Sequence, residues 1–429
     1  MLDIQRIRED TEAVRQGILN KNVRIDFDVI LKLDQLRRDV IGEGEVLKHE
    51  RNVVSKKVAM RKKNKEDASD LIDRTREIGQ RIKALDDQQK ETEAELEKLL
   101  MQIPNLPHIS TPIGKDAAEN PVVREWGTRY EPGFSLKTHL ELGDSLDLFD
   151  FQRGTKIAGP GFPLYTGKGA RLERGLINFM LDFHIDKHGY TEVLPPVVSN
   201  QKAMTTTGQL PKFEDDMYKI PQDELYLIPT AEVPVTNIHQ GEIIAEEALP
   251  IHYCAYSACF RREAGSYGKD TRGFLRLHQF NKVELVKFTV PDESYTELEK
   301  LRRDAEEILE ALGLEYRVIE LVTGDLSFAA SKCYDLELWA PGEDRWLEVS
   351  SCSNFEDFQA RRGAIRYKPE GGGKVQLLHT LNGSGVATPR LLVALLETYQ
   401  QADGSVLLPE ILAPYMGSAG LLLEVSSKK

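Results

Sequence analysis

Two long stretches of regularly spaced apolar residues occupy the first hundred positions of the chain. The first stretch follows heptad spacing with polar interruptions: Leu33, Leu36, Val40, Leu47 and Val54 carry the repeat, and Glu43, Glu50 and Lys57 interrupt it. The second stretch steps by four and three throughout: Leu71, Thr75, Ile78, Ile82, Leu85, Gln89, Thr92, Leu96 and Leu99. The polar segment 64–69 between them is a turn candidate, so we expect an antiparallel helical hairpin over about residues 30–100. A shorter amphipathic helix is expected before it, over residues 4–19.

The pattern changes at the proline-rich segment that begins at residue 103. Beyond it the spacing predicts helices and short strands in alternation: helices over 171–186 and 293–312, and strands over 190–196, 315–322, 334–340 and 345–350. The last two strands flank Pro341-Gly342-Glu343-Asp344, which is typical of a hairpin turn. Hairpins between strands favour an antiparallel sheet, and no G-x-G-x-x-G sequence follows a strand.

We therefore expect an α+β protein in three parts. Residues 1–102 form an N-terminal domain that carries the helical hairpin, and residues 103–125 form a linker. Residues 126–429 form a second domain, built on an antiparallel sheet that is flanked by helices.

Around residues 260–284 the alternation continues, but charged residues occupy one of the two faces. The apolar face holds Leu275, Leu277, Val283 and Leu285, and the polar face holds Arg276, His278, Phe280, Lys282 and Glu284. Arg261 and Glu263 share a parity on the incoming strand, and Gly265, Gly268 and Gly273 suit a long, mobile hairpin. Such a face is either solvated or surrounds a polyanion, with an aromatic ring for stacking, and the pattern alone leaves both open.

The charge distribution bears on the choice of partners. The 429-residue chain has 56 basic and 69 acidic residues, a net charge of −13, which by itself argues against a nucleic-acid binder. The segment 48–65, however, has eight Lys or Arg and a single Glu, so one end of the hairpin is strongly positive. The hairpin is therefore either a dimerisation device or an arm that reaches a phosphate backbone.

Other features of the composition limit compartment and cofactors. The chain has no apolar run of about 18 residues, and its N-terminus is too charged for a signal peptide, so we expect a cytoplasmic protein without a membrane partner. Four cysteines occur without a C-x-x-C pair: Cys254, Cys259, Cys333 and Cys352. We expect buried free thiols, and no zinc.

Several motifs in register resemble one enzyme family. The segments concerned are FRREAG at 260–265, GFLRLHQFNKVE at 273–284, TAEVP at 230–234, LEVSSCSNFEDFQARR at 347–362 and NGSGVATPR at 382–390. The order and spacing of these motifs resemble those of class II aminoacyl-tRNA synthetases, and their amino-acid sequences resemble those of seryl-tRNA synthetases of bacterial type. The helix and strand over 171–196 resemble the first class II motif, with Pro196 at its marker position; in the family this motif forms the interface of a homodimer.

The resemblance implies a serine–tRNA ligase that forms seryl-adenylate from serine and Mg-ATP and then loads tRNA(Ser). Family members also load tRNA(Sec) where it exists. The hairpin would lie against the long variable arm and elbow of the tRNA, and the basic residues we assign to it are Lys48, Arg51, Lys56, Lys57, Arg61, Lys62 and Lys63.

The resemblance also assigns the ATP site. Arg261 would hold the α-phosphate and the serine carboxylate, and Arg390 the γ-phosphate. Glu348 and Ser351 would ligate the Mg²⁺ that bridges phosphates. The rest of the assigned ATP site surrounds the adenine or adjoins these residues: Arg262, Glu263, Leu277, Phe280, Val349 and Ser350.

Serine would be held by Arg261 and by five further residues: Thr230, Ala231, Glu232, Glu284 and Ser384. Glu284 would accept a hydrogen bond from the serine hydroxyl, and such a pocket rejects alanine because it would leave a buried carboxylate unmatched. Arg261, Glu348 and Arg390 are the residues expected to act directly in catalysis.

Without the resemblance, each of these motifs also has a simpler explanation. TAE is equally consistent with a helix cap followed by an acid, and LEVSS with an edge-strand face. Thr388 as N-cap and Pro389 at the first position predict a helix through residue 400 that puts Arg390 in its first turn. A surface arginine tolerates the small cost of opposing the helix dipole.

Two other functions remain to be separated from tRNA charging. A synthetase paralogue could load a carrier protein, although such proteins typically lack the arm that this sequence contains. A catalytically dead RNA-binding or scaffold protein could keep the fold, although Arg261, Glu284, Glu348 and Arg390 are all present.

Overall fold

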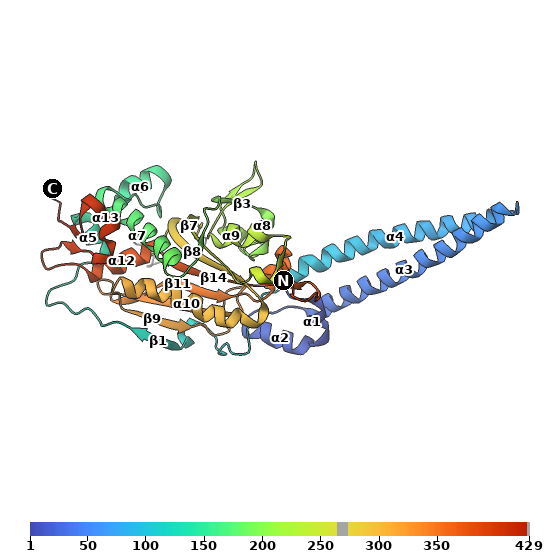
Figure 1. Cartoon of the computed structure of the whole chain (residues 1–429), viewed down its shortest axis with the longest axis horizontal. Helices are drawn as coiled ribbons and strands as arrows, with labels where there is room; N and C mark the ends of the chain where they lie inside the picture. The colour runs from blue at the N-terminus through green and yellow to red at the C-terminus, as the bar shows by residue number, and fades with distance from the viewer. Residues whose placement is uncertain (264–272, 427–429) are drawn as a thin grey trace. The chain divides into compact units, whose positions relative to one another are not determined.

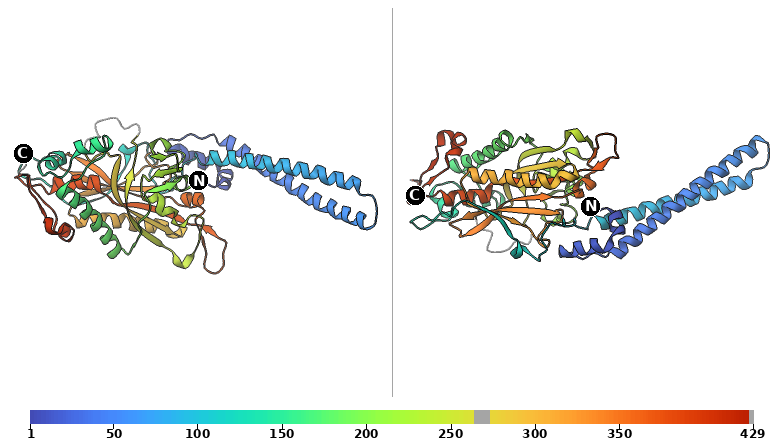
Figure 2. Two further views of the ribbon diagram at one scale, coloured as in Figure 1. Left: turned by 90° about the horizontal axis from the view of Figure 1, so that it is seen from above. Right: turned by 60° about the horizontal axis from the view of Figure 1, so that its bottom comes forward.

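The computed structural model describes residues 1–263 and 273–426 and divides the chain into two compact units, Met1–Pro104 and Asn105–Lys429. Each unit is described by itself. Figure 1 and Figure 2 show the first as helices only and the second as a twisted sheet with helices packed on it. Gly265 and Gly268, expected in a mobile hairpin, lie outside the described residues.

The first unit contains the expected antiparallel helical hairpin. Its helices are α1 (Ile4–Glu9), α2 (Thr11–Asn20), α3 (Phe27–Lys63) and α4 (Ser69–Leu100). The turn between α3 and α4 falls within the predicted segment. The single helix expected over residues 4–19 is wrong, because Asp10 ends α1 and its side chain caps α2 by accepting from the N–H of Ala13.

Ion pairs between α3 and α4 explain why the heptad pattern of α3 is interrupted. Glu43 pairs with Arg81 at 2.8 Å, and Glu50 pairs with Arg74 at 2.8 Å. The apolar contact beside them is a small cluster of Val54, Ile78 and Ile82. Both acidic interruptions therefore form ion pairs with the partner helix instead of breaking the contact between the two helices.

The second unit is built on an eight-stranded sheet of order β1-β9-β10-β11-β14-β8-β7-β2. Neighbouring strands are antiparallel except β2 and β7, which are parallel. In sheet order, the strands are Val122–Trp126, Tyr316–Glu320, Lys332–Ala340, Arg345–Asn354, His379–Ala387, Gln279–Thr289, Ile251–Phe260 and Thr191–Glu192. The α+β fold with an antiparallel sheet is confirmed, as is the hairpin of β10 and β11.

Strand β8 shows why the polar face predicted near residue 282 is not solvated. Val283 and Leu285 join the main core, which includes residues of the helices α7 (Gly167–Asp186), α10 (Ser294–Ala311) and α12 (Thr388–Thr398). Lys282 and Glu284 point to the other face, yet they are only 6% and 0% exposed. Both faces of the sheet are therefore covered, and the charged residues of β8 lie inside the unit.

Several boundaries differ from the sequence prediction. The strand expected over 190–196 shrinks to β2, where Pro195 and Pro196 have no N–H to donate to a ladder. The strand expected from Phe274 begins only at Gln279, so Leu277 joins the lining of the pocket described below.

The start of α12 also departs from expectation, and the segment 103–125 makes specific contacts with the sheet unit. Helix α12 begins one residue early, with Ala387 at the N-cap, because the Thr388 hydroxyl donates to Glu173 at 2.5 Å, and the helix ends at Thr398 instead of residue 400. In segment 103–125, Asn105 bonds Phe328, Ala329, Ser331 and Phe355 in the second unit, and β1 pairs with β9.

Candidate active site

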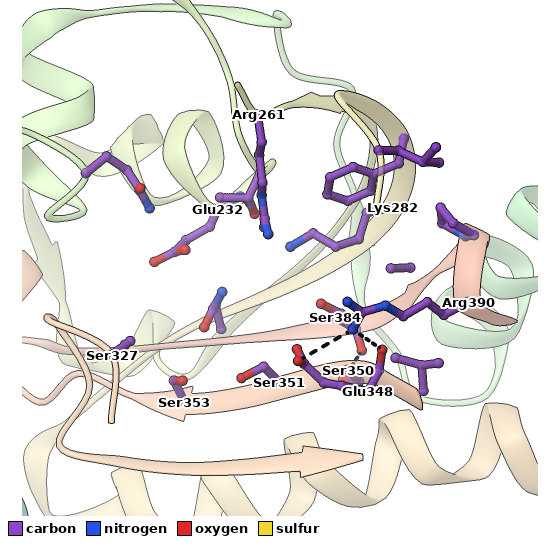
Figure 3. Close-up of a pocket in the computed structure, with 18 of the residues that line it drawn as sticks. Glu232, Arg261, Lys282, Ser327, Glu348, Ser350, Ser351, Ser353, Ser384 and Arg390 are labelled. Carbon is purple, nitrogen blue, oxygen red and sulfur yellow. Dashed lines mark hydrogen bonds and ion pairs between the residues drawn. The ribbon is translucent and has the colours of Figure 1, made fainter. Parts of the chain in front are cut away.

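A pocket of about 510 Å³ lies on the face of the sheet that carries Lys282. Strands β8, β11 and β14, the first turn of α12 and the segments 207–213, 274–277 and 327–329 contribute to its wall. In Figure 3, Arg261 and Lys282 lie on one side of the space, and Arg390 and Glu348 lie together on another. Two arginines and a carboxylate around one cavity suit a polyanionic ligand with a bound cation.

Most of the residues predicted for the site line this pocket. They are Thr230, Glu232, Arg261, Glu263, Leu277, Phe280, Glu348, Val349, Ser350, Ser351, Ser384 and Arg390. Ala231 and Glu284 are completely buried and lie behind the lining. Arg262 is exposed and donates its backbone N–H to Asp216, so the structure does not place its side chain on the wall.

Glu284 is a buried carboxylate whose partners form part of the pocket wall. The Thr230 hydroxyl donates to one oxygen at 3.0 Å, and the Asn382 amide donates to the other at 2.7 Å. Lys282, two residues away on the same face of β8, forms an ion pair with it. Glu284 therefore fixes the direction of three polar side chains, each of which lines the cavity.

Glu232 is a second buried carboxyl group at this end of the pocket. Burial and, after it, the charge of Glu284 raise the pKa of Glu232 to about 7. The Gln359 amide donates to its Oε1 at 2.6 Å. Glu232 can thus change charge near neutral pH, and when ionised it suits an ammonium group.

Arg261 follows directly after β7 and lies over an aromatic ring. Its guanidinium carbon is 5.1 Å from the ring centroid of Phe280, and its Nε donates to the Pro229 carbonyl at 3.4 Å. Glu263, two residues on, pairs with Arg276 at 3.1 Å. These contacts place a cation over an aromatic face on one wall of the pocket, and both groups suit the recognition of a nucleotide.

A β-bulge explains how Glu348 and Ser351 come to share the pocket. Residues three apart in a regular strand face opposite ways. Here Glu348 pairs with Glu337 and Ser350 pairs with Leu336, so Val349 is an extra residue and the parity of the strand changes. The hydroxyl oxygen of Ser351 and the carboxylate oxygens of Glu348 therefore lie on one wall of the pocket. Oxygen ligands are those that Mg²⁺ prefers, so this pair fits the expected ion.

Arg390 closes the site from the first turn of α12. Its Nη1 donates to the backbone carbonyl of Glu348 at 2.8 Å and lies 3.6 Å from the carboxylate of the same residue. Its Nε donates to the Leu275 carbonyl at 3.3 Å. The side chain is 32% exposed, so a charged group remains available to a ligand in the pocket.

Three lining or supporting residues had no role in the sequence prediction. Lys282 was recognised only as part of a polar face, and Asn382 lies two residues before Ser384 on β14, so the strand period could have indicated it. Gln359 comes from α11 (Phe358–Gly363) and meets Glu232 only through the fold. It lies within the motif at 347–362, but nothing in that motif indicates the contact with Glu232.

The remaining predicted residues lie elsewhere. On the hairpin, Lys56, Lys57, Lys62 and Lys63 are exposed, whereas Lys48 pairs with Asp86 at 3.1 Å and Arg61 pairs with Asp70 at 2.7 Å. Arg51 is half-buried on α3. Pro196 is exposed, next to Leu194, which is 83% exposed, and Val197.

All four cysteines are free and buried, as predicted. Among the described residues, no helix is both long and apolar enough to cross a membrane.

Comparisons with known proteins show the family. Residues 1–107 match the seryl-tRNA synthetase N-terminal domain, and residues 212–399 match the tRNA synthetase class II core domain (G, H, P, S and T). A serine–tRNA ligase from Thermoanaerobacter pseudethanolicus is 56% identical over 97% of this chain and 98% of its own length. The chain belongs to the seryl-tRNA synthetase family. A second seryl-tRNA synthetase relative, the serine–tRNA ligase of Caldanaerobacter subterraneus, is 55% identical over the same shares.

Solved seryl-tRNA synthetases have the same fold. The enzyme from Pyrococcus horikoshii, determined in complex with ATP, matches with a TM-score of 0.92 at 37% identity over 99% of this chain and all of its own. The cytoplasmic enzyme from Naegleria fowleri, in complex with AMP, matches with a TM-score of 0.88 at 30% identity, over 99% of each chain.

Proposed function

We propose that this chain activates serine with ATP to form seryl-adenylate and then transfers the seryl group to the 3′ end of tRNA(Ser), and of tRNA(Sec) where it exists. The observation that carries the proposal is the pocket itself. A buried carboxylate, Glu284, orients polar groups at one end, and two arginines, Arg261 and Arg390, line the same cavity.

In the first step a serine carboxylate oxygen attacks the α-phosphorus of ATP, and pyrophosphate leaves. Arg261 contacts the carboxylate and the α-phosphate, and Arg390 contacts the γ-phosphate, so both cations offset charge that develops as the phosphate bond breaks. Glu348 and Ser351 would hold the Mg²⁺, and the ion would neutralise phosphate charge. The adenine lies between Phe280 and the main chain near Leu277, beside Glu263.

Serine is selected at the opposite end. The ionised form of Glu232 accepts from the ammonium group, and Thr230, Ser384 and Glu284 surround the hydroxyl. A ligand without a hydroxyl leaves these buried groups unmatched, which disfavours alanine.

In the second step a hydroxyl of the terminal ribose attacks the carbonyl carbon of the adenylate, and AMP leaves. The substrates supply the nucleophile and the leaving group, so alignment and charge stabilisation are what the residues contribute.

The helical hairpin binds the tRNA. Exposed lysines near its turn, among them Lys56, Lys57, Lys62 and Lys63, provide a positive surface on a chain that is acidic overall. The exposed segment with Leu194 and Pro196 forms the contact between two copies in a homodimer, which acts in the cytoplasm.

Serine-dependent exchange of pyrophosphate into ATP, followed by charging of tRNA(Ser), tests the proposal. Exchange without tRNA together with charging when tRNA is added supports it. Exchange without charging would favour a carrier-protein paralogue, and the absence of both would favour a catalytically dead scaffold.

A further inference from the structure

A buried histidine outside the proposed ligand contacts lies at the base of the pocket wall. His139 is the first residue of α5 (His139–Ser145) and is 0% exposed. Its Nδ1 lies 3.3 Å from Glu397 and 3.2 Å from Glu343. Its Nε2 accepts a hydrogen bond from the backbone N–H of Phe274 at 3.4 Å.

These contacts fix the tautomer of His139. An imidazole nitrogen that accepts from a backbone N–H has no proton of its own, so the proton lies on Nδ1, where it is shared between two carboxylates. The ring therefore joins Glu397 on one side to the main chain of Phe274 on the other.

Glu397 is itself held rigidly by three backbone donors. The N–H of His139 donates to Oε1 at 2.8 Å, and the N–H groups of Gly342 and Glu343 donate to Oε2 at 2.9 and 3.1 Å. The carboxylate is 0% exposed. The start of α5 and the turn between β10 and β11 thus both converge on one side chain of α12.

Arg390 and Glu397 lie on the same side of α12, because seven residues correspond to nearly two turns, or about 10 Å. At one point Arg390 donates to the carbonyl of Leu275. At the other, Glu397 acts through His139 on the N–H of Phe274. Two neighbouring residues of segment 273–277 are therefore attached to one helix.

The approach of the main chain to His139 is close. Gly273 has a φ of +60°, and a Cβ at that position would lie 2.2 Å from the Nε2 of His139. The segment that follows lines the pocket with Phe274, Leu275, Arg276 and Leu277. A change at His139 would therefore be transmitted to residues that form the wall.

We propose that His139, oriented by Glu397, is a positioning residue. It fixes the position of the backbone of segment 273–277 in the pocket wall and thereby determines the affinity of the site for ATP. The inference rests on the proposed use of this wall for the nucleotide. His139 touches no substrate; it acts through the backbone of Phe274 and, with Arg390, keeps the adenine side of the pocket in place.

Two substitutions of similar size separate this role from simple packing. In His139→Gln the amide oxygen reaches the position of Nε2 and still accepts from Phe274, whereas the shorter side chain of His139→Asn reaches only the position of Nδ1. We expect His139→Asn to raise the KM for ATP in pyrophosphate exchange about tenfold, the usual scale for a buried hydrogen bond, while the KM for serine changes less than about twofold. His139→Gln should restore most of the affinity for ATP.

A matched control is His379→Gln, which replaces a half-buried histidine that contacts Ser294 instead of the pocket wall. It should leave both KM values unchanged. Thermal unfolding of every variant gives the loss of stability separately.

Three results would overturn the inference. Equal effects of His139→Gln and His139→Asn, or equal rises in the KM for ATP and for serine, would show a merely structural role. A stoichiometric divalent metal in the purified wild-type protein that both variants lose would show that His139, Glu343 and Glu397 form a metal site instead. If the wild-type protein itself shows no serine-dependent exchange, the proposed function fails, and not only this inference.

Discussion

Glu232 and Glu284 are two buried carboxyl groups at one end of the pocket, and the charge of Glu284 opposes ionisation of Glu232. Lys282 forms an ion pair with Glu284. Because the pKa of Glu232 is raised to about 7, its protonated form dominates below neutral pH and its carboxylate above.

We therefore predict that the KM for serine falls as the pH rises from about 6 to 8, since the carboxylate form of Glu232 binds the ammonium group. Glu232→Gln should weaken serine binding and remove this pH dependence, while the KM for ATP stays the same. Exchange assays across the pH range measure both constants. A wild-type KM for serine that is flat over this range would contradict the role of Glu232.

Removing the charge of Arg261 should stop adenylate formation without unfolding the protein. Arg261→Ala should lower the rate of pyrophosphate exchange about 150- to 900-fold, which corresponds to a loss of about 3 to 4 kcal/mol of transition-state stabilisation. Arg153→Ala, at an exposed arginine of α6 (Phe151–Ala158), is the matched control. Exchange within about threefold of wild type would sink the assignment.

Glu284→Gln should reduce serine activation by about a hundredfold or more, because it leaves Lys282 buried without its counter-charge and weakens the acceptor for Thr230 and Asn382. Discrimination between serine and alanine should narrow at the same time. The ratio of kcat/KM for the two amino acids measures this, with Tm as a check on folding. Unchanged discrimination would place serine selection elsewhere.

The helical hairpin should be dispensable for adenylate formation and necessary for charging. The residues 43–81 can be replaced by a short loop, because Glu43 and Arg81 already lie side by side in an ion pair. This deletion keeps the lower hairpin, in which Asp34 bonds Arg8. Serine-dependent exchange should persist while tRNA charging is abolished.

Charge neutralisation tests the same hairpin without shortening it. We consider a variant in which five basic residues are neutralised together: Lys56, Lys57, Arg61, Lys62 and Lys63. This variant should bind tRNA more weakly. The negative slope of log affinity against log salt should become less steep, by somewhat under one unit for each phosphate that the variant no longer neutralises. Neutralising Arg74 and Arg81, which are paired with Glu50 and Glu43, is the control and should change the slope little. If the variant with five substitutions binds tRNA with the same affinity and the same salt dependence as the wild type, the hairpin acts in oligomerisation instead.

The long helices and the antiparallel sheet could be predicted because their signals are local and repeat many times. The spacing from Leu71 to Leu99 indicates one helix without help from any other segment. The motif residues of the pocket were found through the resemblance, and most of them do line one cavity.

What the sequence could not predict depends on contacts between distant segments. The parity of β11 changes at Val349 only because β10 pairs with it through a bulge. Thr388 does not cap α12 because its hydroxyl donates a hydrogen bond to Glu173, which lies more than two hundred residues earlier in the chain. The sequence of β8 left open whether its charged face is solvated, because the strand itself contains no signal that other segments cover this face.

Strand β8 has a consequence for how the specificity of this protein can evolve. The side chains of Lys282 and Glu284 belong to the pocket, while those of Val283 and Leu285 pack in the main core. Successive residues of the strand therefore alternate between substrate selection and folding. A lineage that changes the amino acid it accepts cannot shift this strand without disturbing the core behind it. We expect the accompanying compensatory substitutions on α7 and α10, at positions that never touch a substrate.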